Sequence, residues 1–397
     1  MQRILWVLSL IWLFISLNLQ AAELSAYDYQ QLQQADKLIE QQLYPQAKIY
    51  LNDYLKRLGS NDRPSYPQAL AQLALGRIAL AEDHYSQAYP YFNQAYQGKV
   101  LPEAQQLSLL LTLAQLDLNL EHWQQGVIHL QQWFKQAPPE QQKARHYQLL
   151  AFGQYQLKHW TDGLAAMRQA FSMRNNPPQN WYNLGVALAI ANHSWPQAIQ
   201  WQSHLVELDP QSMQQWQQLA ALQMRNHQSK AALATMRLAW QRGLFNRTDH
   251  YQLLAQLANT AKIPYLAAQV LDDGIDKHVV KANISHVRWL AGLWIQARQF
   301  DQAIDRYQQL CQLEPTRQNY HQYLSLLANQ QRWKELLQNA TLAERHVQSP
   351  RIDLLKGIAA TQLQKYTQAE QFFKQAKRSE QYASSSQSWM NYIQQIR

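Results

Sequence analysis

The same eleven-residue pattern occurs twice in this chain of 397 residues, first as YSQAYPYFNQA at 85–95 and again as YTQAEQFFKQA at 366–376. The two copies share six residues, including the alanines at 88 and 369. Further residues along the chain occupy the same setting, and we call all of them anchors. The anchors are Ala47, Ala88, Gly126, Gly163, Ala198, Ala232, Ala267, Ala303, Leu336 and Ala369. They lie between 33 and 41 residues apart, a period that predicts a helical repeat.

Aromatic residues reinforce this period, because most anchors have an aromatic residue three positions before them. These residues are Tyr44, Tyr85, Trp123, Trp160, Trp195, Phe300, Trp333 and Tyr366. Small residues at the anchors allow two helices to approach closely, while the large residues fill the space between one hairpin and the next. A single hairpin cannot bury its apolar stripe alone, so neighbouring hairpins must stack.

The segment WYNLGVAL at 181–188 reads W-x-x-L-G-x-x-L, and parts of it recur before other anchors. With the anchor pattern it resembles the tetratricopeptide repeat (TPR) family over about residues 28–380. The resemblance implies an all-α fold, a right-handed superhelical TPR solenoid of about ten helical hairpins spanning 23–380. The pattern departs from the family at a long polar loop at 56–67, at one extra residue in 192–195, and at Leu336, where a small residue is expected. NNPP at 175–178 interrupts the helices and leaves open whether the array bends there.

A helical array needs a polar end, and residues 381–397 are expected to form a C-terminal capping helix. Ser385 or Ser386 is the predicted helix start. In this helix Trp389, Ile393 and Ile396 fall on one face, which would cover the tenth hairpin.

Residues 1–22 have the composition of a secretory signal peptide, with one cation, Arg3, an apolar run at 4–19, and then Ala21 and Ala22. We therefore predict cleavage near these alanines and a periplasmic location, in a bacterium. The alternative is an uncleaved inner-membrane anchor, although the run is shorter than the about 20 residues that span a bilayer.

The composition and net charge of the chain limit the classes of partner that it is expected to bind. The net charge is +9, and an exported cationic protein would meet anionic lipid, cell-wall polymer or an acidic protein segment, with no nucleic acid. The 64 Gln interleave with apolar residues at helical spacing. The single cysteine, Cys311, excludes an intramolecular disulfide and is interpreted as a buried thiol.

Chemical sites are not predicted. The thirteen His form no H-E-x-x-H or Cys/His metal spacing, and there is no phosphate loop or G-x-S-x-G motif. We therefore predict no catalytic residues, no metal, no cofactor, no small-molecule substrate and no enzymatic activity.

Two sets of residues are predicted to bind a partner. The TPR resemblance implies a groove lined by the first helix of each hairpin, here Arg77, Gln115, Gln148, Phe152, Tyr155, Tyr182, Gln217, Arg225, Gln256, Asn259, Arg288 and His321. Residues 211–248 contain no acidic residue, which predicts a basic patch. Its members are Arg225, Lys230, Arg237, Arg242 and Arg247.

The overall plan resembles the periplasmic TPR proteins encoded with TonB–ExbB–ExbD systems in gammaproteobacteria. The segments that carry this likeness are SKAALATMRLAWQRG at 229–243 and the ending SQSWMNYIQQIR. The resemblance implies a scaffold that assists TonB-dependent energy transduction, as in iron–siderophore uptake, by binding an extended or helical segment of TonB, ExbB or ExbD. The alternative is an adaptor in cell-envelope assembly, serving peptidoglycan, polysaccharide export or pilus machinery, peripheral at the inner membrane or the cell wall.

Overall fold

A computed structural model describes residues 24–59 and 64–396, so the predicted signal peptide lies outside the described residues. The described part is all-α: it contains 21 α-helices, one 3-10 turn, η1 (Pro139–Gln141), and no strand. This confirms the predicted fold class. Across these described ranges, every helix is too short or too polar to cross a membrane.

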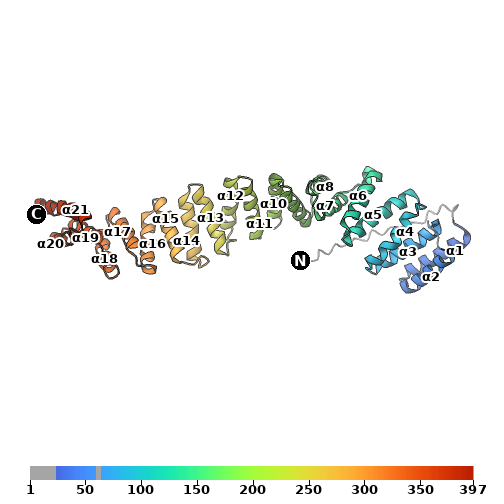
Figure 1. Cartoon of the computed structure of the whole chain (residues 1–397), viewed down its shortest axis with the longest axis horizontal. Coiled ribbons are helices and arrows are strands. Elements are labelled where there is room, and N and C mark those ends of the chain that lie inside the picture. Colours follow the sequence, from blue (N-terminus) through green and yellow to red (C-terminus); the bar gives the residue numbers. More distant parts are fainter. Residues whose placement is uncertain (1–23, 60–63, 397) are drawn as a thin grey trace. The chain divides into compact units, whose positions relative to one another are not determined.

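The chain divides into two compact units, unit 1 (Met1–Ser194) and unit 2 (Trp195–Arg397) (Figure 1). Unit 1 contains α1 (Ala26–Glu40), α2 (Tyr44–Leu58), α3 (Tyr66–Ala81), α4 (Tyr85–Gln97), α5 (Glu103–Asn119), α6 (Trp123–Gln136), α7 (Ala144–Gln156), α8 (Trp160–Ser172) and α9 (Gln179–Ala191). Unit 2 contains α10 (Trp195–Leu208), α11 (Met213–Arg225), α12 (Ser229–Gln241), α13 (Thr248–Thr260), α14 (Pro264–Asp276), α15 (Ile284–Gln296), α16 (Phe300–Leu313), α17 (Arg317–Asn329), α18 (Trp333–Ala343), α19 (Pro350–Gln362), α20 (Tyr366–Ala376) and α21 (Glu380–Ile396). The NNPP segment is the loop between α8 and α9, inside unit 1.

Ten short turns join an odd-numbered helix to the next even-numbered helix, and all ten have the same backbone. The residue five before each anchor has a positive φ, between 53° and 64°. The next residue donates its N–H to the carbonyl nine before the anchor, at 2.8 or 2.9 Å. This is the Schellman arrangement that ends helices. The recurrence of one turn at ten places confirms ten helix pairs, including the pair at Leu336, whose side chain is fully buried.

The repeated stretch is explained by a close helix contact. In the second pair Phe92 of α4 packs on Gly76 of α3, where an added Cβ would approach the ring to 2.7 Å. In the tenth pair Phe373 of α20 packs on Gly357 of α19 in the same way. The anchors Ala88 and Ala369 are fully buried. The two stretches therefore do the same packing between the two helices of a pair.

The last helix differs from its prediction in two respects. It begins at Glu380, so Ser386 lies inside α21 and is fully buried; a small side chain fits where this helix packs on α19 and α20. Trp389 and Ile393 contact Phe373, as expected. Ile396, the final residue of the helix, is 42% exposed, so it does not join this contact as predicted.

Candidate interaction surface

The predicted groove residues share one face of the odd-numbered helices. Eleven of the twelve lie 15, 11, 8 or 7 residues before their anchors, and Tyr182 is displaced by one because its pair has an extra residue. Positions spaced by three, four and seven residues occupy the same side of an α-helix. The structure places them on α3, α5, α7, α9, α11, α13, α15 and α17. We call this side of the odd-numbered helices the first-helix face.

Several aromatic members of the first-helix face contact rings of their own chain. Phe152 packs edge-on against Trp123, Tyr155 lies 5.4 Å from Trp160, and Tyr182 lies 4.9 Å from Phe171, between ring centroids. All three are half-buried. A partner would therefore meet their edges rather than open rings. Gln148 is only 2% exposed, which removes it from the surface that a partner could reach.

The charged members of the face also have neighbours within the chain. Arg77 lies near Asp36, and burial raises the pKa of that carboxyl while the arginine lowers it. The Arg225 guanidinium lies over the Trp195 ring, 5.6 Å from its centroid, and Arg288 pairs with Glu314.

His321 contacts the Ser349 hydroxyl at 2.7 Å. Burial, and then the nearby Arg351 and Arg317, lower the pKa of His321. The imidazole is therefore biased toward its neutral form.

The amides are the accessible part of the face. Gln256 is exposed, and Gln115, Gln217 and Asn259 are half-buried. Sequence reasoning missed a row of exposed amides seven residues before the anchors, at the ends of the odd-numbered helices. Its members are Asn119, Gln156, Gln296, Asn329 and Gln362. The constant offset from the anchors was the signal that could have revealed them.

An amide side chain both donates and accepts hydrogen bonds, so a row of amides can bind the backbone of an extended segment. In unit 2 the row occupies three successive pairs, at Gln296, Asn329 and Gln362. The arrangement suits a polar, sequence-tolerant contact with a peptide.

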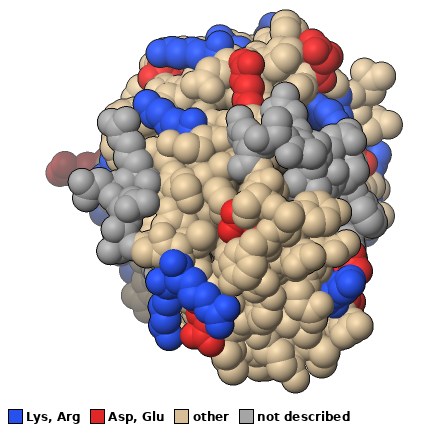
Figure 2. All heavy atoms as spheres, turned by 90° about the vertical axis from the view of Figure 1, so that its right-hand side faces the viewer, with Lys and Arg blue, Asp and Glu red and all other residues tan. Residues whose placement is uncertain are grey.

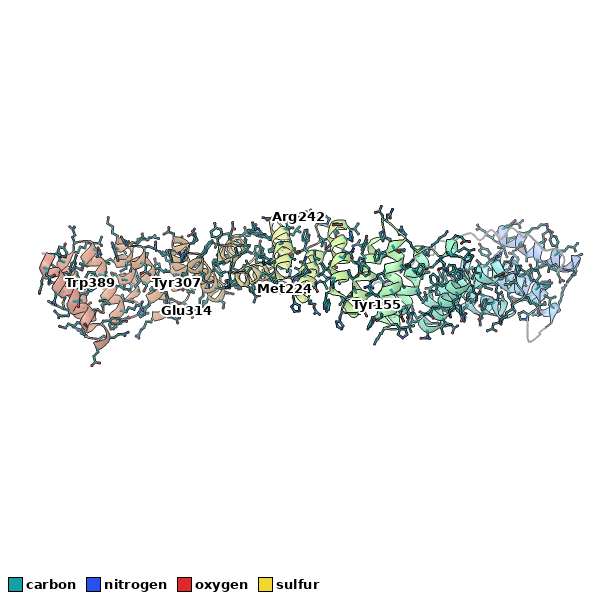
Figure 3. All side chains as sticks on the ribbon, turned by 90° about the horizontal axis from the view of Figure 1, so that it is seen from above. Tyr155, Met224, Arg242, Tyr307, Glu314 and Trp389 are labelled. Atoms are coloured by element: carbon teal, nitrogen blue, oxygen red, sulfur yellow. The ribbon has the colours of Figure 1, made fainter. Side chains whose placement is uncertain are left out.

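The five residues of the predicted basic patch are all exposed, but the structure does not bring them together. Arg225 and Lys230 lie at the turn between α11 and α12, whereas Arg242 and Arg247 lie at the loop between α12 and α13. The thirteen residues of α12 separate these ends by about 20 Å. Figure 3 shows Met224, beside Arg225, and Arg242 at opposite ends of this pair. Arg242 lies over the Trp216 ring, and Arg247 pairs with Asp249 at 2.9 Å.

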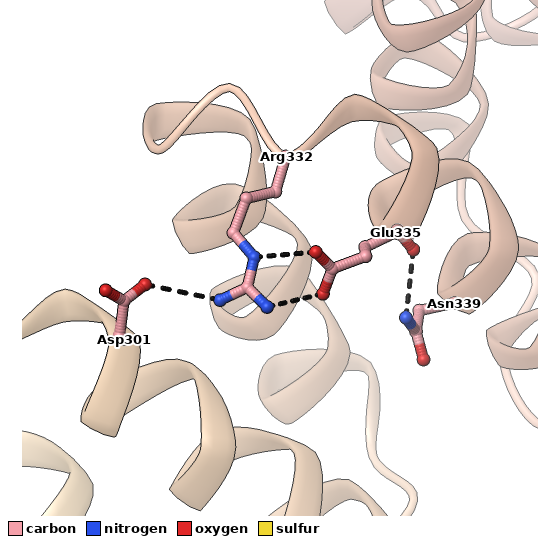
Figure 4. A network of polar contacts seen from close by, with 4 residues as sticks. All are labelled: Asp301, Arg332, Glu335 and Asn339. Atoms are coloured by element: carbon pink, nitrogen blue, oxygen red, sulfur yellow. Dashed lines mark hydrogen bonds and ion pairs between the residues drawn. The ribbon is translucent and has the colours of Figure 1, made fainter.

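Ion pairs also join neighbouring pairs of helices along the turns. Arg332, at the start of α18, binds Glu335 through two nitrogens and reaches Asp301 of α16 at 3.3 Å (Figure 4). In unit 1, Lys48 of α2 binds Glu82 at the end of α3 at 2.6 Å. Successive turns therefore lie side by side along one edge of each unit, which we call the turn edge.

Buried polar groups elsewhere join the two helices of one pair. Asp117 of α5, fully buried, accepts a 2.7 Å hydrogen bond from His129 Nδ1 of α6, and Gln125 donates to the other ring nitrogen. Gln223 of α11, at the same distance from its anchor as Asp117, accepts from Thr235 of α12 at 2.8 Å. This recurrence indicates a structural role.

The geometry of the described residues favours neither a reactive cysteine nor a metal site. Burial raises the pKa of the Cys311 thiol to about 12, which keeps it protonated and unreactive at neutral pH. Residues 24–59 and 64–396 contain no group of three His, Cys, Asp or Glu side chains placed to hold a metal ion.

The chain resembles several solved structures, all of those named below at low identity and low TM-score. No protein-family model and no curated protein matches the chain. Among solved structures, a tetratricopeptide repeat protein from Parabacteroides merdae is 12% identical, covering 68% of this chain and 100% of its own, with a TM-score of 0.37. YrrB, a TPR protein with an unusual peptide-binding site, is 11% identical over 49% of this chain and 91% of its own, with a TM-score of 0.37. The P58(IPK) TPR domain is 12% identical over 94% of this chain and 98% of its own, with a TM-score of 0.26.

Proposed function

We propose that this chain is a protein-interaction scaffold that binds an extended or helical segment of a partner along its first-helix face. The observation that carries the proposal is the row of exposed amides on three successive pairs of unit 2, at Gln296, Asn329 and Gln362. Side-chain amides there would bind the backbone of the segment. Arg225, on the first-helix face of the same unit, would add positive charge.

The partner proposed is a periplasmic segment of TonB, ExbB or ExbD, with the scaffold serving iron–siderophore uptake after export by the N-terminal signal peptide. This more specific proposal is supported by a resemblance to TonB-associated periplasmic TPR proteins. The resemblance lies in the order of signal peptide and helical array and in residues 229–243. Deletion of the gene should then slow siderophore-dependent growth, while growth on free iron should be normal. Equal growth of both strains on siderophore would contradict the TonB role and leave the scaffold role standing.

The test of the scaffold itself is in-cell cross-linking from the first-helix face. A photoreactive residue at Gln256, Gln296 or Asn329 should give partner adducts that mass spectrometry identifies. The matched control places the same group at Gln308 or Gln338, exposed residues on the even-numbered helices α16 and α18. Equal adducts from both sets would show that binding does not use the first-helix face.

A second candidate is an adaptor in cell-envelope assembly. The charge of unit 2 favours this candidate. Unit 2 contains 22 Lys and Arg and 14 Asp and Glu, whereas unit 1 contains 14 Lys and Arg and 13 Asp and Glu. Anionic wall polymers would be attracted to such a unit. Adducts with wall enzymes or export components in the same cross-linking experiment would select this candidate over the TonB system.

A further inference from the structure

Two neighbouring turns of unit 2 combine exposed cations with exposed apolar side chains. One joins α11 to α12 and the other joins α13 to α14. We call their exposed residues the turn patch: Met224, Arg225, Lys230, Lys262, Ile263 and Tyr265. Lys262 is the residue with positive φ in its turn, so it lies at the tip. The patch therefore projects from the turn edge of the unit.

The apolar members of the patch are unusually open to water. Met224 and Ile263 are each 43% exposed, and Tyr265 is 51% exposed although its ring touches Trp294 edge-on. Exposed apolar side chains on two successive turns are the kind of surface that binds a partner. The inner edge of Tyr265 is fixed by Trp294, and its outer part remains free to contact a partner.

The cations of the patch are not neutralised by carboxylates. Between residues 211 and 271 the sequence holds one acidic residue, Asp249. It lies at the start of α13, at the opposite end of the helix from the patch, and it pairs with Arg247. Among the described residues, Lys230 and Lys262 have no ion pair within 4.0 Å. The next turn along the edge carries exposed Arg298, together with Asp301, which pairs with Arg332.

From this geometry we propose that the turn patch docks unit 2 on an anionic phospholipid surface. Lys and Arg are attracted to anionic headgroups, and their aliphatic stems lie along apolar surface while the charges stay in water. Tyrosine favours the boundary between headgroups and acyl chains. Two projecting turn tips can enter a headgroup layer without any change in the fold. This proposal shares Arg225 with the scaffold proposal, but it otherwise uses the turn edge and a different kind of partner, and the variants below leave Arg225 unchanged.

The test is flotation of the whole chain with lipid vesicles, of pure phosphatidylcholine or of phosphatidylcholine containing phosphatidylglycerol. The apolar run at 4–19 would bind both kinds of vesicle, so the quantity of interest is the difference between them. Tighter binding to anionic vesicles that weakens with added salt is expected. Equal binding to the two would overturn the proposal, and it would direct attention to acidic protein partners instead.

Charge reversal tests the location. Lys230→Glu, Lys262→Glu and Arg298→Glu together should lower anionic-vesicle binding by about tenfold or more. The matched control reverses Lys281, Arg345 and Arg378, exposed cations at the opposite edge of unit 2, and changes the net charge equally. A circular dichroism melt checks that both variants fold. Equal loss in the two variants would assign the binding to net charge and overturn the patch.

The apolar half of the patch has its own variant. Met224→Ser with Ile263→Ser should reduce the binding that survives at high salt by a few-fold, because ion pairing is screened there and insertion is not. The control is Leu313→Ser with Leu342→Ser, two residues that are similarly exposed but lie away from the turn edge. No difference between these double variants would contradict insertion of the patch.

Discussion

In unit 1 neighbouring pairs of helices meet through aromatic rings, such as Trp123 with Phe152 and Phe134 with Tyr147. In unit 2 they also meet through ion pairs that join three successive boundaries: Asp272 with Arg306, Asp301 with Arg332, and Glu344 with Lys356. The described residues of unit 1 have one such ion pair between pairs of helices, Lys48 with Glu82.

The same hairpin backbone therefore accepts two kinds of contact between neighbouring pairs of helices, aromatic contacts and ion pairs. Unit 1 is nearly neutral, and at its α1 end cations and anions are interspersed among uncharged residues (Figure 2). Unit 2 has an excess of eight cations, and some of them are held in ion pairs across its boundaries. The comparison teaches that helix packing in this repeat is fixed by the buried residues at the anchors, nine of them small, while the contacts between neighbouring pairs vary.

The largest effect is expected where unit 2 buries a charge. Lys356 is 4% exposed, binds Glu344 and lies 4.1 Å from the Phe372 ring. Glu344→Ala leaves the ammonium buried without its partner, and should lower the free energy of unfolding by about 2–3 kcal/mol. Lys356→Met removes both the charge and its desolvation cost, and should change stability by less than about 1 kcal/mol. Denaturant unfolding measures both, and equal losses would show that the pair is stabilising in itself.

The close glycine contacts should respond alike in both units. Gly76→Ala in unit 1 and Gly357→Ala in unit 2 each force a Cβ into a phenylalanine ring, and should cost about 2 kcal/mol. Gly292→Ala in α15 is the control, since nothing lies within 4 Å of its added Cβ, and it should stabilise by about 0.5–1 kcal/mol. Thermal melts compare the three. A large difference between the stability losses of Gly76→Ala and Gly357→Ala would contradict the conclusion that the helices pack in the same way in both units.

Acid should weaken unit 1 through His146. Burial, and then the nearby Arg145 and Lys143, lower the pKa of His146 to about 4. The folded state keeps this imidazole neutral, whereas the unfolded chain binds a proton below about pH 6.5. The stability that neutral His146 contributes is therefore fully present above pH 6.5 and is lost as the pH falls toward 4. Because the side chain is partly exposed, the expected loss in the free energy of unfolding is about 1–2 kcal/mol.

The variant that tests this is His146→Gln. The imidazole accepts the Lys143 N–H at 3.3 Å, and a glutamine at this position can accept it too without titrating. Urea unfolding at pH 7 and at pH 4.5 should differ less for the variant than for the original chain. Identical pH dependence of the two proteins would exclude His146 as the source.

The smallest effects are expected at the turn tips. Lys158 in unit 1 and Gln331 in unit 2 have φ values of 61° and 56°, which strain any residue with a Cβ. Lys158→Gly and Gln331→Gly should each stabilise by about 0.5–1 kcal/mol. Alanine at either position keeps the Cβ and should change stability little. Thermal melts distinguish these outcomes, and destabilisation by glycine at both tips would show that their side chains hold the turns.

Much of the fold could be predicted from sequence because the anchors are local and chemically distinctive. A residue such as Ala88 or Ala369 must be small where two helices touch, so its spacing reveals every pair. The row of amides was not predicted because some of its members are Asn and others are Gln. They are related only by their position seven residues before an anchor. Ser386 was misread because a buried serine and a capping serine look alike. The basic patch joined residues that are near in sequence but lie at opposite ends of α12.

The ten left-handed turn residues have a consequence for how such a chain can change. Glycine would fit each of these tips best, yet all ten are occupied by Gln, Asp, Glu, Lys, His or Arg. All ten side chains are exposed, so a substitution at a tip changes the surface of the turn rather than the buried packing. The residues at the tips can therefore change one at a time during evolution. Such substitutions would alter what the turns of either unit bind, while the packing of the helices stays the same.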